Sequence, residues 1–182
     1  MIRVVPLDES FRGVELTFRY WTEYYYDVTA QEGPEGFSFV LERRNFGQPV
    51  EKTFVDTLLS QWLEAPQLYG AEADGGIRGY LELNHERWNN RMRVTNLLVE
   101  EGFRRQGIGR LLMDTAVEKA REAGARALVL ETQSCNGQAI RFYRRNGFSL
   151  VGFDLTAYSQ TDVQKKEVRL EMARPVCGQT KE

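Results

Sequence analysis

The chain has 182 residues, of which 42% are hydrophobic and 27% charged, a composition typical of one soluble, folded domain. Its formal net charge of −2 argues against a general nucleic-acid binder, which would carry a basic surplus. The sequence contains no apolar run approaching the about 18 residues of a transmembrane helix, so no contact with a membrane is expected.

Residues 1–6 are predicted to form a strand and not a signal peptide, so a cytoplasmic location is expected. The two cysteines, Cys135 and Cys177, do not form a CxxC motif, and His85 is the single histidine. Neither a disulfide framework nor a metal site is expected from this set. Both cysteines are interpreted as small neutral residues, and residues 177–182 as a frayed tail.

Hydrophobic periodicity and turn residues predict the elements in chain order. Residues 14–55 should contain two strands joined by the glycine-proline turn at 33–36, and residues 53–63 should form a helix. The predicted buried residues of this helix are Phe54, Leu58, Leu59 and Trp62. Strands are then expected at 68–73, 77–83, 94–99, 127–132, 148–151 and 167–172, with helices from Ile108 to Ala123 and at 138–146. Hairpin turns are predicted at 74–76 and 88–91.

The most informative segment lies between the strand at 94–99 and the helix that begins at Ile108. It is rich in glycine and arginine: Gly102, Arg104, Arg105, Gly107, Gly109 and Arg110. Glycines there let several backbone N–H groups face one point, and at a helix N-terminus such a group of donors binds anions. The segment is therefore predicted to bind a phosphate-bearing ligand; the alternative is a tight turn with exposed arginines.

Two common phosphate motifs do not match this segment. A P-loop needs Lys followed by Ser or Thr where the sequence has Ile108 and Gly109. A dinucleotide-binding motif needs a third glycine where the sequence has Leu112. Both motifs fail at residues that would touch the ligand or shape its site.

Arg104, Gly107 and Gly109 instead match the pattern R/Q-x-x-G-x-G/A, and a second signature, NGQAIRFYRRNGF, follows at residues 136–148. With both motifs in this order, the sequence resembles the GNAT superfamily of acyl-CoA N-acetyltransferases over residues 68–155. The resemblance implies an α/β fold with a mixed, mostly antiparallel sheet, a splayed parallel strand pair and helices on both faces. Residues 1–182 would form a single acetyltransferase domain, divided into a substrate-side part (1–66), an acetyl-CoA-binding core (68–155), closing strands (156–174) and a tail (175–182).

The resemblance also implies acetyl-CoA as cosubstrate, with no metal, and assigns residues to it. The implied contacts are Leu98, Val99, Arg104, Arg105, Gln106, Gly107, Ile108, Gly109, Arg110, Asn136, Ala139 and Tyr143. The amides of residues 105–110 would hold the pyrophosphate, and the strand edge at Leu98–Val99 would pair with the pantetheine arm. Tyr143 would donate a proton to the leaving thiolate, since a nearby phenol stabilises charge on sulfur. The alternative for Tyr143 is a core aromatic residue.

The acceptor amine must lose a proton, so a base is sought among the strand carboxylates. Glu82 on the strand GYLEL is the first candidate for this catalytic role, with Glu131 and Asp154 behind it. A solvated carboxylate without a role is the alternative. Family members often carry a carboxylate near the position of Asn96, and His85 could serve in place of Glu82.

The acceptor side is predicted from the segment 14–36, in which acidic residues are interleaved with aromatic ones. Such surfaces attract cationic amines through charge and cation–π contact; the alternative is an aromatic strand that packs on the sheet. The runs LETQSCN and FYRRNGFSLVGFD resemble the streptothricin acetyltransferase branch. The predicted reaction is direct acetylation of a primary amine of a small cationic molecule in a ternary complex, without an acyl-enzyme on Cys135. Alternatives are acetylation of protein N-termini or lysines and a non-catalytic CoA-binding module; the resemblance also allows a homodimer.

Overall fold

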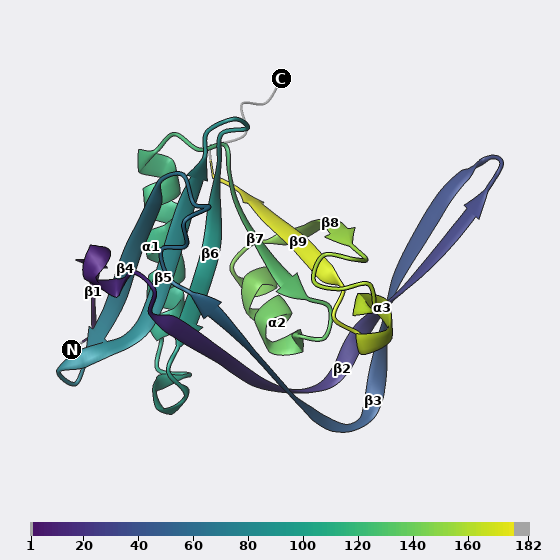
Figure 1. Ribbon diagram of the computed structural model, residues 1–182, viewed down its shortest axis with the longest axis horizontal. Helices are drawn as coiled ribbons and strands as arrows, with labels where there is room; N and C mark the ends of the chain where they lie inside the picture. Colours follow the sequence, from purple (N-terminus) through teal and green to yellow (C-terminus); the bar gives the residue numbers. More distant parts are fainter. Residues whose placement is uncertain (1, 177–182) are drawn as a thin grey trace. The chain divides into compact units, whose positions relative to one another are not determined.

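The computed structural model describes residues 2–176, so Cys177 and the predicted frayed tail lie outside the described residues (Figure 1). The described chain divides into two compact units. The first contains residues 2–18, 54–130 and 173–176, and the second contains residues 19–53 and 131–172. Within the described residues, no helix is both long and apolar enough to cross a membrane.

The first unit is built on a mixed sheet. Its strands, in spatial order, are β1 (Arg3–Leu7), β4 (Pro66–Ala73), β5 (Gly76–Glu86), β6 (Arg91–Val99) and the first residues of β7 (Ala127–Gln133). Neighbouring strands are antiparallel except β6 and β7, which pair in parallel from Arg91↔Ala127 to Val94↔Leu130. This arrangement confirms the predicted mostly antiparallel sheet with one parallel pair.

The turns of this sheet follow from local sequence. Asp74 and Gly75 both have positive φ, 48° and 76°, which is the backbone of a tight two-residue hairpin between β4 and β5. The second predicted hairpin is also present, with its turn at residues 87–90 between β5 and β6. Short 3-10 helices, η1 (Glu9–Phe11) and η2 (Glu101–Phe103), follow β1 and β6.

The helix α1 (Ile108–Glu122) packs on β5 and β6 because its apolar residues recur at helical spacing. Its buried residues are Ile108, Leu112, Met113, Ala116, Val117 and Ala120. Two glycines in the left-handed region bound the helix, Gly107 with φ 90° before it and Gly124 with φ 65° after it. A Cβ at Gly79 of β5 would lie 3.0 Å from Ile108 Cγ2 and 3.1 Å from both Leu112 Cδ1 and the Leu98 carbonyl oxygen. Glycine at this position therefore permits the close approach of helix and strand.

Two long strands, β2 (Glu15–Gly33) and β3 (Gly36–Thr57), form a separate two-stranded sheet with its turn at residues 34–35, as predicted. The predicted helix at 53–63 is wrong, because β3 continues to Thr57. Thr53, Val55 and Thr57 are β-branched and suit a strand, and Phe54 stacks on Phe18 of β2 with ring centroids 4.6 Å apart.

Of the four residues of this segment that were expected to be buried, only two are. Leu58 and Leu59 are buried, and they form a core cluster with Leu16 and Leu68. In contrast, the side chain of Trp62 is exposed (69%), and that of Phe54 is also on the surface (38%). The apolar spacing was compatible with a helix, but pairing with β2 decided the conformation.

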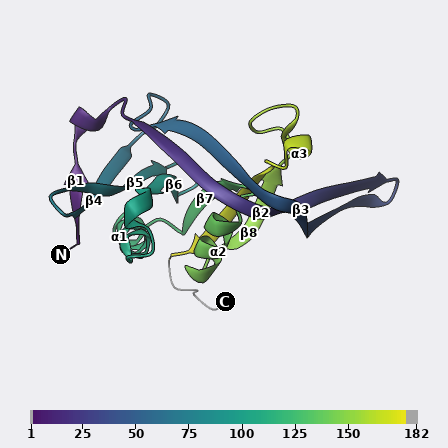
Figure 2. The ribbon, with the colours of Figure 1, turned by 90° about the horizontal axis from the view of Figure 1, so that it is seen from below.

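The second unit contains the end of β7, α2 (Gly137–Arg145), β8 (Ser149–Asp154), α3 (Asp162–Lys165) and most of β9 (Arg169–Pro175). Its core is a cluster of Ile140, Val168 and Leu170. Side chains from both strands of the β2–β3 ribbon pack against that cluster, namely Tyr26, Val28 and Leu41. In both views the turn of the ribbon extends away from α3 and β9 of the same unit (Figures 1 and 2).

Replacing Gly79 with alanine should lower the free energy of unfolding by about 1 to 3 kcal/mol, because the added methyl group overpacks the contact between β5 and α1. Urea denaturation would measure the change. The matched control is Gly33→Ala, where an added Cβ meets no described atom within 4 Å and φ is not positive. Equal stability of the two variants would contradict a tight contact at Gly79.

Candidate active site

The glycine-arginine segment of the first unit forms a turn that ends in the N-terminus of α1. Arg105 and Gly107 both have left-handed backbone, with φ 63° and 90°. The first N–H groups of a helix have no partner in the preceding turn, and α1 is a 15-residue helix whose dipole adds to them. A Cβ added at Gly107 would meet no described atom within 4 Å, so the surface at this turn is open. The turn is suited to an anionic ligand.

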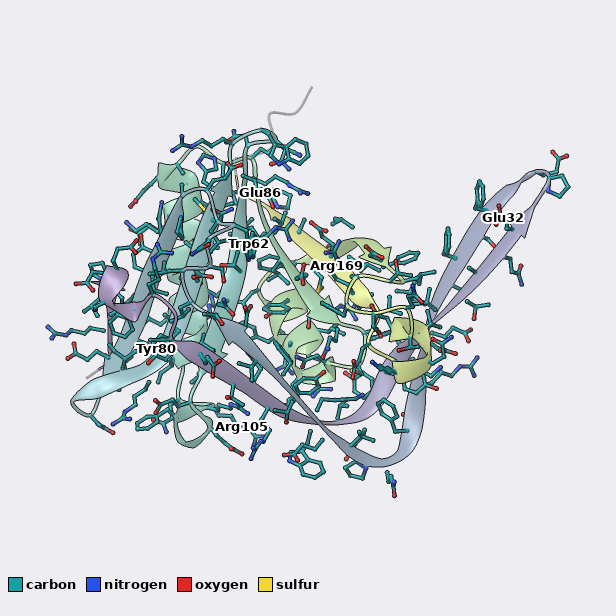
Figure 3. All side chains as sticks on the ribbon, viewed as in Figure 1. Glu32, Trp62, Tyr80, Glu86, Arg105 and Arg169 are labelled. Atoms are coloured by element: carbon teal, nitrogen blue, oxygen red, sulfur yellow. The ribbon has the colours of Figure 1, made fainter. Side chains whose placement is uncertain are left out.

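Some side chains of this turn bond to neighbouring parts of the chain, and others are exposed to solvent. Arg104 donates from Nε to the Val99 carbonyl oxygen at 3.1 Å, and Gln106 donates from Nε2 to the Gly102 carbonyl oxygen at 3.1 Å. Arg110 pairs with Asp114 one helical turn later. Arg105 is exposed (Figure 3). Arg104 and Gln106 therefore hold the turn in shape, and the backbone is the main surface offered to a ligand.

A further contact that the sequence did not reveal holds the residues before the turn. Arg78 of β5 pairs with Glu100 at 3.1 Å, and its guanidinium lies 4.7 Å from the ring centroid of Phe103. The Glu100 N–H also donates to the Arg78 carbonyl oxygen at 2.9 Å. These contacts attach η2 to β5, so the turn starts from a defined position.

Glu82 is buried in the first unit, not solvated, with 1% of its surface exposed. Its Oε1 accepts from the Leu59 N–H at 2.6 Å. Its Oε2 accepts from the Thr95 hydroxyl at 2.6 Å and from the Asn96 carboxamide at 3.0 Å. A carboxylate has about four acceptor positions, so most of those of Glu82 are taken.

The backbone around Glu82 explains this geometry. Glu82 is opposite Asn96 in the register of β5 and β6, and the next pair is Leu83 with Val94, so Thr95 is the extra residue of a β-bulge. The bulge turns the Thr95 hydroxyl toward the carboxylate. Leu59, with φ 55°, aims its N–H at the same group from the connection between β3 and β4. The candidate base is thus the centre of a hydrogen-bonded cluster.

The other candidate bases have separate partners. His85 lies at the end of β5, and its Nε2 is 3.0 Å from Asn90 Oδ1. In the second unit, Glu131 and Asp154 both approach Arg169, at 3.5 and 3.6 Å. Hydrogen bonds from Thr156 lower the pKa of Asp154, which weakens it as a base.

Asn136 and Ala139 act together at the start of α2. Asn136 is the N-cap, and its Oδ1 accepts from the Ala139 N–H at 3.1 Å. The ligand contact implied for Asn136 would therefore fall to its NH2 group. Gly137 follows directly, where a Cβ would lie 2.5 Å from the Tyr24 ring, so the first turn of α2 requires glycine.

Tyr143 lies on α2 between two other aromatic rings, with centroids 5.6 Å from Phe142 and 5.9 Å from Phe148. Burial raises the pKa of Tyr143 to about 12, because the charged phenolate would lose its hydration. The hydroxyl consequently keeps its proton at neutral pH. It is able to donate a hydrogen bond to a group that gains negative charge.

Cys135 is buried, and its Sγ lies 3.3 Å from the Tyr20 hydroxyl, which donates to Gln133 Oε1 at 2.6 Å. Burial raises the pKa of the Cys135 thiol, so the nucleophilic thiolate is disfavoured. The environment of Cys135 therefore argues against an acyl-enzyme on this residue.

The acidic and aromatic residues of the segment 14–36 do not form one cluster. Asp27 pairs with Lys166 at 3.0 Å, and the Lys166 ammonium lies 5.0 Å from the centroid of Tyr25. Two arginines, Arg43 and Arg141, lie over the ring of Tyr24, which is buried. Glu32 and Glu35 lie at the turn of the ribbon, where Figure 3 labels Glu32. Trp21 and Glu23, in the first half of β2, are exposed to solvent, and we call these two residues the ribbon base.

Comparison with known proteins gives one family. The model of the acetyltransferase (GNAT) family matches residues 15–148. A streptothricin acetyltransferase of Streptomyces lavendulae is 33% identical over 175 residues, covering 92% of this chain and 89% of the relative.

Solved structures agree in fold. The crystal structure of nourseothricin acetyltransferase matches with a TM-score of 0.76 and 30% identity, covering 97% of this chain and 99% of that one. A Bacillus anthracis protein in complex with acetyl coenzyme A matches with a TM-score of 0.74, covering 96% and 98%. At 20% identity, this second likeness concerns the fold alone.

Replacing Glu82 with glutamine should lower the free energy of unfolding by about 1 to 3 kcal/mol, because the new NH2 group must face the donor of Leu59 or those of Thr95 and Asn96. Urea denaturation would measure this. Glu118→Gln, on the exposed face of α1, is the matched control and should be neutral. A Glu82→Gln variant with unchanged stability whose kcat falls by about 100-fold or more would instead favour Glu82 as the base.

Proposed function

This chain belongs to the GNAT acetyltransferase family, and from that premise we propose that it acetylates an amino group of a streptothricin-class antibiotic. The proposed acceptor class is inferred from how much of the chain is similar to known antibiotic acetyltransferases. The relative from Streptomyces lavendulae and the nourseothricin enzyme match almost from end to end, so the likeness includes the β2–β3 ribbon as well as the coenzyme motifs. We further take residues 1–182 as one acetyltransferase domain, because the family match at 15–148 includes residues of both units.

Acetyl-CoA supplies an activated acetyl group as a thioester. We assign the pyrophosphate to the backbone amides of Arg105–Arg110, because this turn has left-handed residues, an open surface and a helix N-terminus. Leu98 and Val99 at the end of β6 are assigned to the pantetheine arm. Arg104 supports both regions, since its side chain bonds to the Val99 carbonyl oxygen.

The reaction forms a carbon–nitrogen bond and breaks the carbon–sulfur bond. The amine gives up a proton to water as it attacks the carbonyl carbon, and the departing sulfur takes one from a hydroxyl that water then reprotonates. We assign the proton on sulfur to the Tyr143 hydroxyl, which keeps its proton at neutral pH. The three hydrogen bonds to Glu82 favour a role in positioning Thr95 and Asn96 on β6 over direct removal of the amine proton. Transfer is direct, in agreement with the neutral thiol of Cys135.

A small cationic acceptor also fits the exposed residues of the ribbon base. Glu23 and Trp21 are exposed there and offer a negative charge and an aromatic face to an ammonium group. Protein acetylation and coenzyme binding without turnover are the alternatives, and the near-complete match to antibiotic acetyltransferases does not favour them.

Thiol release from acetyl-CoA should be measured with a panel of acceptors: streptothricin, an aminoglycoside, a polyamine and a short peptide. We expect the highest kcat/KM with streptothricin, and mass spectrometry should find a single added acetyl group on it. A preference for the peptide would overturn the acceptor class, whereas coenzyme binding without turnover of any acceptor would overturn the enzyme itself.

Gly107→Val should raise the KM for acetyl-CoA by at least about tenfold, the equivalent of one lost hydrogen bond to a charged group. The matched control is Gly124→Val at the other end of α1, because both glycines have positive φ and open surroundings, so both variants carry a backbone penalty. Calorimetry with CoA would measure binding directly. If both variants bound CoA equally well, the pyrophosphate would lie elsewhere.

Tyr143→Phe should lower kcat by about 100-fold or more with little change in CoA affinity, because it removes only the hydroxyl. In the unmodified enzyme, kcat should not fall on an alkaline limb near pH 10, the ordinary tyrosine pKa, since the folded protein holds this proton up to about pH 12. Tyr69→Phe is the control for a tyrosine without an assigned role. Unchanged turnover in Tyr143→Phe would exclude the hydroxyl as the acid.

A further inference from the structure

Tyr24 of β2 lies against the first turn of α2, within the second unit. It is buried, with 6% of its surface exposed. A Cβ added at Gly137 would lie 2.5 Å from the Tyr24 ring and 2.7 Å from its hydroxyl oxygen, so the ring touches the helix backbone. The Tyr24 hydroxyl donates to the Gly137 carbonyl oxygen at 3.3 Å and accepts from Arg141 Nη1 at 2.7 Å. One side chain of the ribbon therefore bonds to two successive turns of α2.

The Tyr24 ring is itself held in place by the ribbon. The guanidinium of Arg43, on β3, lies 3.9 Å from the centroid of the ring, and the Tyr26 ring meets it edge to face at 6.0 Å between centroids. Both kinds of contact stabilise one orientation of an aromatic ring. A second bond joins the same strand to α2, because Gln138 Nε2 donates to the Trp21 carbonyl oxygen at 3.2 Å. The ribbon therefore offers α2 a fixed support.

The helix α2 depends on tertiary contacts for its position. It has nine residues, whereas isolated helices shorter than about 12 residues are marginally stable in water. Its buried residues are Gly137, which lies against Tyr24, and Ile140, which packs on Val168 and Leu170. The position of α2 is therefore set at its first turn by Tyr24 and in its middle by Ile140.

Tyr143 leaves α2 on the side turned away from Tyr24. It follows Arg141 by two residues, and at about 100° per residue the two side chains point in nearly opposite directions. A displacement of the short helix at Gly137 therefore also moves the Tyr143 hydroxyl. An acid must lie within about 3.2 Å of the atom that it protonates. A misplacement of about 1 Å can cost about 100-fold in rate, so the support under α2 matters for turnover.

We propose that Tyr24 is a positioning residue for Tyr143. Its ring and its two hydrogen bonds hold α2 where the Tyr143 hydroxyl reaches the departing sulfur. The inference rests on the proposed role of Tyr143 as the acid, and adds the residue that sets the place of that acid. Tyr24 itself exchanges no proton in the reaction and is assigned no contact with the coenzyme or the acceptor. The ribbon thus contributes to the chemical step from a distance, through the helix.

Tyr24→Phe tests the proposal by steady-state kinetics, because it keeps the ring at Gly137 and removes only the bonds of the hydroxyl. We expect kcat to fall about tenfold, less than the loss for a full 1 Å displacement. The KM for acetyl-CoA should change by less than about threefold, since the turn that we assign to the pyrophosphate belongs to the first unit. The matched control is Tyr26→Phe on the same strand. Tyr26 also packs on the core of the second unit, but among the described residues its hydroxyl makes no bond to α2, so kcat should not change.

The double variant Tyr24→Phe/Tyr143→Phe separates positioning from a general loss of structure. If Tyr24 acts through the Tyr143 hydroxyl, replacing Tyr24 should lower kcat by less than about twofold once that hydroxyl is absent, because residues that act as a unit are not additive. Losses that multiply, or full activity in Tyr24→Phe, would overturn the positioning role and leave the assigned acid intact. Unchanged kcat in Tyr143→Phe would instead overturn the assigned acid, and the positioning role with it.

Fluorine NMR of the full chain labelled with fluorotyrosine gives a second readout that needs no turnover. The resonance of Tyr143 is identified as the one that disappears in Tyr143→Phe. It reports the position of the ring, because the rings of Phe142 and Phe148 lie 5.6 and 5.9 Å away and shift it according to their placement. Tyr24→Phe should move this resonance, and Tyr26→Phe should leave it in place. A Tyr143 resonance that does not move in Tyr24→Phe would contradict the proposal whether or not any acceptor is acetylated.

Discussion

A buried carboxylate connects three parts of the first unit. Glu82 on β5 accepts from the bulged Thr95 and from Asn96 on β6, and from the Leu59 N–H in the connection between β3 and β4. Burying a charge is costly unless donors surround it, and the β-bulge supplies one of those donors. The path of β6 toward Val99 therefore depends on this cluster. The hydrogen bonds of Glu82 thus stabilise the fold and also position the strand that we assign to the coenzyme.

The turn that we propose as the coenzyme site is positioned by contacts from the same strands. Arg78 of β5 holds Glu100 and Phe103, and Arg104 binds back to Val99. On the other side, Gly79 allows α1 to approach β5 closely. The proposed anion site is thus a backbone feature with few side chains of its own. This agrees with a ligand recognised by its phosphate charge, since amides and a helix dipole bind any diphosphate of suitable shape.

The second unit contributes chemistry of another kind. Asn136 caps α2, and burial keeps the Tyr143 hydroxyl protonated two residues before the helix ends at Arg145. The aromatic residues of the ribbon are largely engaged by the protein's own cations, so less of this surface is available for an acceptor than the sequence suggested.

The sequence by itself determined the features that depend on local backbone chemistry. Left-handed glycines at Gly107 and Gly124 bound a helix whose apolar spacing is visible in the residues, and the Asp74-Gly75 turn required positive φ. Tertiary structure decided the rest, because it depends on pairing between distant residues. The segment at 53–57 had helical spacing but became a strand beside β2, and Glu82 resembled a solvated strand residue until Leu59, Thr95 and Asn96 surrounded it. A charge becomes buried only when the chain brings donors to it from elsewhere, and no short stretch of sequence contains that information.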